Sequence, residues 1–324
     1  MIQDRIDVGI LERFEAGLNP ARPDESTIPA RIIGYGEIST IFEILESSQQ
    51  GLAYKRLPIF YTKDEMDQYE PLFMEYNRVL RHEIGIPVPD HASIRILPQR
   101  GNLVIYNVQE KLPPESIGNQ IIHRSDDESV GMLLECILEK LLDVFSYNQK
   151  GDRITLGIDG QISNWAVKGF SASSPVVTRG CELIYFDTST PLMRINGKEQ
   201  INPDLFLRSA PSFLVWIIKL LFLNDVLTRY YDFRLVVIDL IANLFKEQRK
   251  DLIPAFIDRA NGFFSTHAAS FDISPITLKE IRAYYREDAM IWRLYLALRR
   301  LDRFLTTTVR KKPYVYILPG KITR

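Results

Sequence analysis

The sequence predicts an α+β fold of two lobes, in which a mainly antiparallel sheet with one helix comes first and a largely helical lobe follows. Two patterns support this prediction. Residues 28–112 hold short apolar runs separated by turn-forming glycines, which are typical of strands, whereas apolar residues recur at helical spacing almost throughout residues 204–309. The proline-containing segment Leu112–Glu115 lies between the two patterns, so we expect a linker there.

The first lobe is expected to begin near Ile28. The preceding stretch, residues 19–27, is polar and contains Pro20 and Pro23, so residues 1–27 are predicted to form an extended N-terminal lead-in. Residues 28–112 then make up the first lobe, with predicted strands at 31–33, 40–45, 52–57, 94–97 and 103–109.

One helix interrupts the predicted sheet, over Pro71–His82. Its apolar residues recur at helical spacing. Pro71 suits the first turn of a helix, where a missing N–H costs nothing, and Gly85 follows the predicted end.

Residues 113–324 are predicted to form the second lobe. A helix is expected over Val130–Phe145 and a small β region over Ile154–Phe186, before the helical remainder. The most apolar run, Phe213–Leu223, has only about half of the roughly 20 residues that a membrane span needs, and it contains Lys219. We therefore expect this run to be a buried core helix.

The composition narrows the possible functions. The 324 residues include 40 Lys and Arg and 41 Asp and Glu, a formal net charge of -1, which favours neither nucleic acid nor an anionic membrane as partner. Cys136 and Cys181 each lack a second cysteine or a histidine at metal-ligand spacing, so we expect two reduced thiols. Residues 1–14 show no secretory signal, and we therefore expect a cytoplasmic protein with no nucleic-acid or membrane partner.

Two segments of the first lobe contain candidate phosphate-binding residues. Gly34–Ser39 (GYGEIS) lies between two predicted strands, and glycines let backbone N–H groups approach phosphate oxygens closely. Leu52–Lys55 (LAYK) is an apolar strand that ends in a lysine, whose ammonium group can pair with phosphates. Taken alone, the first segment also fits an ordinary hairpin and the second a solvated strand end.

Two segments of the second lobe contain candidate catalytic and metal-binding residues. Leu156–Trp165 (LGIDGQISNW) places Asp159 and Asn164 five residues apart, so a short loop can fold both side chains toward one point. Cys181–Asp187 (CELIYFD) is a predicted strand that ends in an aspartate. Oxygen ligands of this kind suit Mg²⁺, which usually takes one or two carboxylates together with substrate phosphates. An isolated Asp and Asn at this spacing also fits a simple turn.

In this order and context, the four segments resemble the motifs of the protein-kinase-like superfamily. Met74–Leu80, followed by Gly85–Pro89, resembles in particular the aminoglycoside phosphotransferase branch of small-molecule kinases. The resemblance implies ATP and Mg²⁺ as cofactors, Asp159 as the catalytic acceptor of the hydroxyl proton, and Asn164 and Asp187 as metal ligands. It also implies a set of nucleotide-binding residues: Gly34, Gly36, Ser39, Lys55, Glu75, Gln109 and Gln161.

The resemblance further implies an acidic helix residue that holds Lys55. Glu70 and Glu75 are the candidates. If Pro71 lies in the first turn, Glu75 is inside the helix and Glu70 lies at or before its cap, so Glu75 is the expected partner. A plain surface glutamate is the alternative for Glu75.

The sequence departs from the family pattern at several positions. Ser39 stands where the third glycine usually stands, Gly157 and Ile158 replace the usual His and Arg, and Thr188-Ser189 replaces Phe-Gly. A common pattern is thus broken in three of the four segments.

The family's Ala-Pro-Glu is also missing. The nearest match is Ala210-Pro211-Ser212, which lacks the glutamate and favours the small-molecule branch. In that branch we expect the acceptor to contact residues 188–208, through Arg194, Lys198 and Arg208.

The sequence therefore predicts an ATP- and Mg²⁺-dependent phosphotransferase that acts on a hydroxyl group of a small molecule. The departures favour an alternative, a catalytically inactive pseudokinase or nucleotide-binding scaffold. Against that alternative, the chain has candidates for every phosphate and metal contact: Lys55, Glu75, Asp159, Asn164 and Asp187. A purely structural helical protein would leave these residues unexplained.

Overall fold

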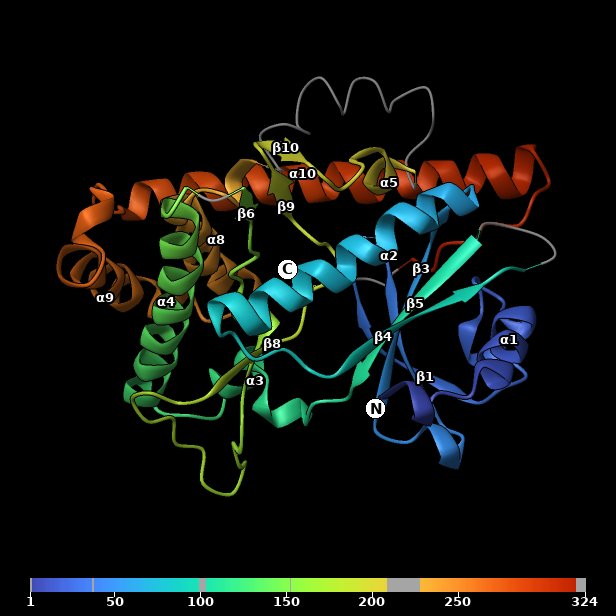
Figure 1. The fold of residues 1–324 in the computed structure, drawn as a ribbon, viewed down its shortest axis with the longest axis horizontal. Coiled ribbons are helices and arrows are strands. Elements are labelled where there is room, and N and C mark those ends of the chain that lie inside the picture. The colour runs from blue at the N-terminus through green and yellow to red at the C-terminus, as the bar shows by residue number, and fades with distance from the viewer. Residues whose placement is uncertain (1, 37, 99–102, 152, 209–227, 319–324) are drawn as a thin grey trace.

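The computed structural model describes residues 2–36, 38–98, 103–151, 153–208 and 228–318. Figure 1 shows a sheet with its helices on one side of the molecule and a mainly helical part on the other. The predicted α+β fold class is confirmed.

Five strands form one antiparallel sheet in the order β1-β2-β3-β5-β4. The central strand β3 pairs with β2 and β5 on its two edges, where Tyr54 lies opposite Phe42 and Val108. Hydrogen bonds on both edges fix this strand and the lysine that it bears. The strand bounds lie close to the predicted ones: β1 (Ala30–Tyr35), β2 (Thr40–Ile44), β3 (Leu52–Phe60), β4 (His91–Ile96) and β5 (Leu103–Glu110).

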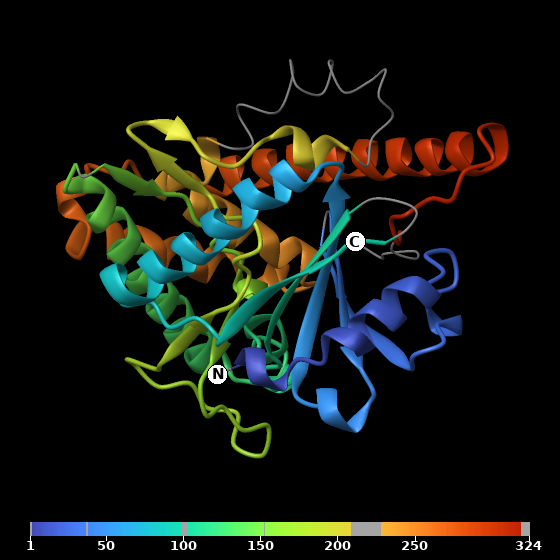
Figure 2. The same ribbon diagram turned by 45° about the vertical axis from the view of Figure 1, so that its right-hand side comes forward.

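Two helices cover the two faces of this sheet, as Figures 1 and 2 show. On one face lies α1 (Val8–Gly17), where the ring of Phe14 meets that of Phe42 edge-on at 5.0 Å. On the other face lies α2 (Lys63–Arg78). Because successive strand residues point to opposite faces, Lys55 points away from α1.

The extended lead-in expected over residues 1–27 is wrong for residues 2–17. A 3₁₀ turn over Ile2–Arg5 leads into α1, which Asp7 caps by accepting a hydrogen bond from the backbone of Ile10. The apolar residues here recur at helical spacing and enter the core of the first lobe: Ile2, Ile6, Ile10, Leu11 and Phe14. Ordered structure thus begins well before Ile28. The division between the lobes after residue 112 stays a prediction.

Helix α2 begins earlier than predicted. Thr62 caps it and forms a capping box with Glu65, so the helix starts at Lys63 and Pro71 lies inside it. Pro71 is exposed, so water can reach the carbonyl group that its missing N–H leaves unbonded. A π-helical turn over Val79–Ile84 continues α2 until Gly85, whose φ of 83° ends the helix as predicted.

The second lobe has the predicted order of a helix, a small β region and further helices. The apolar run Phe213–Leu223 and the segment Ala210-Pro211-Ser212 lie outside the described residues. Among the described residues, no helix is both long and apolar enough to cross a bilayer. The elements are α3 (Gly118–Ile121), α4 (Asp127–Gln149), β6 (Ile154–Leu156), β7 (Trp165–Val167), β8 (Leu183–Tyr185), β9 (Met193–Ile195), β10 (Lys198–Glu199), α5 (Asp204–Leu207), α8 (Phe233–Lys246), α9 (Ile253–Thr266) and α10 (Leu278–Phe304).

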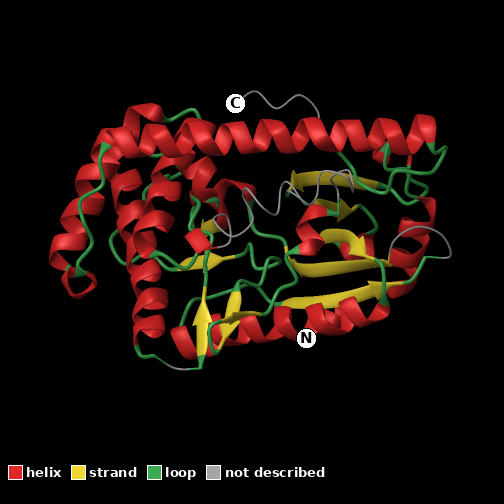
Figure 3. Ribbon diagram, turned by 90° about the horizontal axis from the view of Figure 1, so that it is seen from above, coloured by secondary structure: helices red, strands yellow, loops and turns green. Residues whose placement is uncertain are grey.

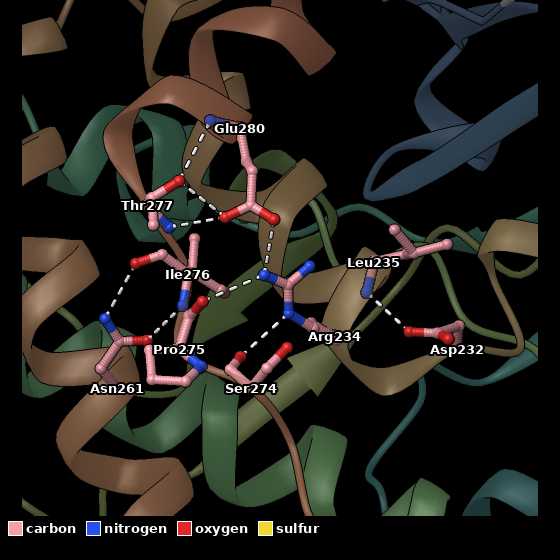
Figure 4. A network of polar contacts seen from close by, with 9 residues as sticks. All are labelled: Asp232, Arg234, Leu235, Asn261, Ser274, Pro275, Ile276, Thr277 and Glu280. Carbon is pink, nitrogen blue, oxygen red and sulfur yellow. Dashed lines mark hydrogen bonds and ion pairs between the residues drawn. The ribbon is translucent and has the colours of Figure 1, made fainter.

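A network of polar contacts fixes the helices of the second lobe to one another (Figure 4). Arg234 of α8 donates hydrogen bonds to the carbonyl groups of Ser274 and Pro275 and pairs with Glu280 at 2.7 Å. The side-chain amide of Asn261 in α9 makes two hydrogen bonds with the backbone of Ile276. The start of α10 is therefore held from both α8 and α9.

The last described residues return to the first lobe. Figure 3 shows the longest helix, α10, along one whole edge of the molecule. Beyond it, Tyr314 and Tyr316 pack beside α2, β3 and β5, and Ile317 joins the core that α1 forms with the sheet. The two lobes are thus connected by α10 and the segment after it, in addition to the linker.

Candidate functional site

Lys55 and Asp187 meet between the two lobes. Lys55 comes from β3 of the first lobe, Asp187 follows β8 in the second, and Lys55 Nζ lies 2.6 Å from Asp187 Oδ1. Burial alone would raise the pKa of Asp187, but the Lys55 ammonium and the Ser189 hydroxyl oppose it and hold the pKa below its ordinary value. The pair therefore consists of an ammonium and a carboxylate.

The predicted catalytic loop places Asp159 and Asn164 close together. The backbone N–H of Gln161 donates to Asp159 Oδ1 at 3.1 Å, and Asn164 Nδ2 donates to the carbonyl oxygen of Asp159 at 3.2 Å. Burial, together with the carboxylates of Asp239 and Asp187, raises the pKa of Asp159 to about 8. Asp159 therefore holds a proton more tightly than an ordinary aspartate does.

The hairpin of β7 and β8 brings Asn164 and Asp187 to one end. Trp165 pairs with Tyr185, and the N–H of Phe186 donates to the carbonyl oxygen of Asn164 at 3.1 Å. Asn164 uses its amide nitrogen for Asp159, so Oδ1 is the atom that it offers a cation. The described residues contain no group of three or more His, Cys, Asp or Glu that could hold a metal. A magnesium ion here would therefore depend on Asp187, Asn164 and substrate phosphates.

The glycine-containing loop between β1 and β2 lies beside Lys55. The N–H of Gly36 donates to the carbonyl oxygen of Ser39 at 3.1 Å. A Cβ at Gly36 would lie 2.4 Å from Ser39 Oγ and 3.7 Å from Lys55 Cε, so a side chain here would require the Ser39 hydroxyl to move and would lie next to the lysine. A Cβ at Gly34 would lie 3.1 Å from Ile41 Cδ1, so a side chain there would require a small shift of Ile41. Glu37 lies outside the described residues.

The expected ion pair between Lys55 and Glu75 does not occur among the described residues. Glu75 instead pairs with Arg78 on the same helix at 2.7 Å. This agrees with the alternative that Glu75 is a surface glutamate. Glu75 lies inside the helix as predicted, but the helix face that meets the second lobe carries Tyr69 and Tyr76. The hydroxyl of Tyr69 donates to the carbonyl oxygen of Ser189 at 2.7 Å, and that of Tyr76 to the carbonyl oxygen of Gly157 at 2.9 Å.

Gln161 faces helix α8. Its Nε2 donates to Asp239 Oδ2 at 3.0 Å, and its Oε1 accepts from Asn243 Nδ2 at 2.9 Å. Burial raises the pKa of Asp239, against the effect of nearby cations such as Lys246. Neither Asp239 nor Asn243 is among the predicted site residues, although a carboxylate and an amide one turn apart in the apolar middle of a helix could have indicated them.

Gln109 lies within β5, opposite Ala53 of β3 and His91 of β4. It is therefore a residue of the sheet, near the point where the chain leaves it. The following Lys111 donates its N–H to the carbonyl oxygen of Gly51 at 2.9 Å.

Neighbouring residues occupy the space around Gly157 and Ile158, the two positions where the predicted catalytic loop departs from the family pattern. A Cβ at Gly157 would lie 3.1 Å from both Leu192 and the ring of Tyr231. The N–H of Ile158 donates to the carbonyl oxygen of Tyr230 at 3.0 Å. Tyr231 thus occupies the space that a side chain at position 157 would need.

The three cations expected near the acceptor lie in different places. The guanidinium carbon of Arg194 lies 3.8 Å from the centre of the Tyr231 ring, next to the predicted catalytic loop. Arg208 pairs with Glu65 of α2 and donates to the carbonyl oxygen of Ile59 at 2.6 Å, so it joins the lobes. Lys198 is exposed on β10. Of the three, Arg194 is the one whose partner, Tyr231, contacts Gly157.

Comparisons with known proteins give a family and similar solved structures. The structure described as WaaP in complex with acyl carrier protein is similar over 71% of this chain and 89% of that chain, with 14% sequence identity and a TM-score of 0.31. No curated protein matches the sequence. The family described as "Family of unknown function (DUF6206)" matches residues 21–303. The chain therefore belongs to the DUF6206 family.

Proposed function

We propose that this protein is an ATP- and Mg²⁺-dependent phosphotransferase of the protein-kinase-like superfamily that acts on a hydroxyl group of a small molecule. The observation that supports it is the 2.6 Å pair of Lys55 and Asp187 across the two lobes. Residues 132 positions apart in the chain meet there, next to a glycine loop and to Asp159. A phosphate-binding lysine, a metal-binding carboxylate and a base are the groups that phosphoryl transfer needs.

Each group has a distinct task in this proposal. Lys55 binds phosphate oxygens of ATP beside the loop in which Gly34 and Gly36 carry no side chain. Asp187 and Asn164 hold the magnesium ion, which would neutralise charge on the phosphates. Asp159 accepts the proton of the acceptor hydroxyl as that oxygen attacks the γ-phosphorus.

The Lys55–Asp187 contact fits equally well with a nucleotide-binding scaffold without turnover, and two further contacts support that alternative. Glu75 does not hold the lysine, and Gln161 faces α8. In both respects, fewer side chains of this site would contact the substrate than in the family pattern. Binding of nucleotide is common to the two functions, and turnover separates them.

The test is a thermal shift with ATP, GTP and Mg²⁺, followed by a phosphoryl-transfer assay. A ligand that binds only the folded state stabilises it by about 2.7 kcal/mol at a hundredfold excess over Kd, so the melting temperature should rise with Mg²⁺ and nucleotide together. No rise with any purine triphosphate at millimolar concentration contradicts both functions. A rise without phosphate transfer or hydrolysis favours the scaffold.

A further inference from the structure

The two cysteines of the chain lie next to each other in the folded protein, although the sequence spacing gave no sign of it. Cys136 is on α4 and is 3% exposed. Cys181 is half-buried, at the end of the segment that connects β7 with β8. Both are free thiols.

The carbonyl oxygen of Thr178 is a common neighbour of both residues. It accepts a hydrogen bond from the N–H of Cys181 at 3.2 Å, and it lies 3.9 Å from Cys136 Sγ, whose S–H donates to it. The two thiols are also close enough to change each other's acidity. A turn of the β7–β8 connection thus holds Cys181 against the side of α4.

The contact changes the acidity of the pair. The nearby Cys181 side chain outweighs burial and lowers the pKa of Cys136 to about 7, while the nearby Cys136 side chain and burial raise the pKa of Cys181. The pair as a whole therefore loses its first proton more readily than an ordinary cysteine does. A thiolate is the form of cysteine that attacks an oxidant or another sulfur, and it attacks best with a pKa near the ambient pH.

We propose that Cys136 and Cys181 form a redox site that closes to an intramolecular disulfide when the protein meets a hydroperoxide. The thiolate attacks one peroxide oxygen, the O–O bond breaks, and a sulfenic acid and hydroxide form. The second sulfur then attacks the sulfenic sulfur, the S–S bond forms, and a second hydroxide leaves. The two thiol protons convert the two hydroxides to water, so two electrons pass from the sulfurs to one peroxide.

The position of this bond gives it a structural effect. The β7–β8 hairpin has Asn164 immediately before it and Asp187 shortly after it. A disulfide at Cys181 ties the loop end of this hairpin, opposite the end that bears Asn164 and Asp187, to α4 and closes the intervening chain into a loop, which restricts the unfolded state. We expect the oxidised protein to melt at a higher temperature than the reduced one. This inference does not depend on the proposed function.

The experiment treats the full chain with hydrogen peroxide under native conditions and measures its intact mass and its peptide map without reduction. The expected product has lost the mass of two hydrogen atoms, yields one cross-linked peptide pair containing both cysteines, and regains two free thiols with dithiothreitol. Its melting temperature should fall back on reduction.

Cys181→Ser is the matched variant, because the residue is half-buried and serine is close in size. It should lose the cross-linked peptide and the rise in melting temperature, while its circular dichroism and its melting temperature in dithiothreitol stay near those of the wild type. The wild-type peptide map decides the question even if the variant folds poorly. Disulfides only between molecules, oxygen adducts without a cross-link, or two thiols that stay unoxidised would each overturn the proposal.

Discussion

At the scale of single residues, the Lys55–Asp187 pair sets the starting state of the site. The side chains are 19% and 35% exposed, so water screens the pair only in part. The contact joins the two lobes, and because an ammonium group has three N–H donors, Lys55 can meet a phosphate while it contacts Asp187. In the proposed function, phosphate is then a second charge-assisted partner of Lys55.

Removal of the lysine tests its role as a phosphate contact. We predict that Lys55→Ala lowers affinity for Mg-ATP by about tenfold or more, which corresponds to about 1.4 kcal/mol or more. The protein should stay folded, because Lys55 is partly exposed. Calorimetric titration measures the loss, with Lys168→Ala as the control, since that lysine forms an exposed pair with Glu182 away from the site. If the variant unfolds, Lys55 has a structural role. If it binds Mg-ATP as well as the control does, Lys55 is not a phosphate contact.

Two aspartates of the site should respond differently to the same substitution. We predict that Asp159→Asn leaves affinity for Mg-ATP nearly intact and lowers transfer by about 10²- to 10⁴-fold, the usual contribution of a positioned base. Asp187→Asn should abolish magnesium-dependent binding as well as transfer, because a hard cation needs the charge of a carboxylate ligand. The measurement is titration with ATP, with and without Mg²⁺, beside a phosphate-release assay. Equal loss of binding in the two variants contradicts the separate roles.

At the scale of elements, α8 positions the loop that is predicted to be catalytic. Asp239 and Asn243 hold both ends of the Gln161 side-chain amide, and the Gln161 backbone holds Asp159. The helix thus supplies a position for the loop and a negative charge near its aspartate. Both effects pass through buried groups, where charges interact strongly.

This arrangement predicts a pH dependence. Asp159 must lose its proton to act as a base, so kcat/KM should rise with pH through about 8. Asp239→Asn removes a negative charge that disfavours this loss, so the midpoint should move to lower pH, whereas Asp143→Asn on the exposed side of α4 should leave it unchanged. An unmoved midpoint in Asp239→Asn contradicts the coupling.

The raised pKa of Asp159 also makes stability depend on pH, and here the direction is opposite: stability falls as the pH rises, whereas kcat/KM rises. The folded protein holds the Asp159 proton from the ordinary value of 3.8 up to about 8, whereas the unfolded chain releases it near 3.8. The folded state binds more protons in this window, so the contribution of Asp159 makes the protein less stable as the pH rises across it.

Local patterns made the elements of the first lobe predictable, and long-range contacts made parts of its site unpredictable. The five strands follow from apolar runs and glycine turns. The sequence prediction starts α2 at Pro71, although Thr62 and Glu65 have the spacing of a capping box. It therefore favours Glu75 over Glu70 as the partner of Lys55, whereas the structure pairs Glu75 with Arg78 and Glu70 with Arg95. The contacts of Gln161 with α8 and of Cys136 with Cys181 join distant parts of the chain, which spacing along the sequence does not encode.

At the scale of the whole molecule, Arg56 connects both ends of the described chain to the sheet. Its guanidinium forms two hydrogen bonds with Glu15 of α1, at 2.6 and 2.7 Å, and a third with the carbonyl oxygen of Val315 at 2.9 Å. The hydroxyl of Tyr106 in β5 donates to the same carboxylate at 2.6 Å. The Arg56 and Glu15 side chains are only 4% and 7% exposed, so each charge depends on the other.

Loss of one partner should therefore destabilise the whole protein. We predict that Glu15→Ala lowers the free energy of unfolding by about 3–5 kcal/mol, because it leaves a buried guanidinium without its carboxylate. Arg22→Ala, which breaks the exposed pair with Glu25, should cost about 0–1 kcal/mol. Urea denaturation measures both changes.

The double variant Arg56→Met with Glu15→Leu separates the cost of an orphaned charge from the loss of packing. Replacing a buried ion pair by apolar residues of similar volume is often neutral or stabilising, so the double variant should recover most of the stability that Glu15→Ala loses. Hydrogen exchange adds the test at molecular scale: in Glu15→Ala, amide exchange should rise both in α1 and in residues 314–317, since Arg56 also holds the carbonyl oxygen of Val315. If exchange rises in α1 alone, the C-terminal segment is held by its aromatic packing, and Arg56 does not couple the two ends of the chain.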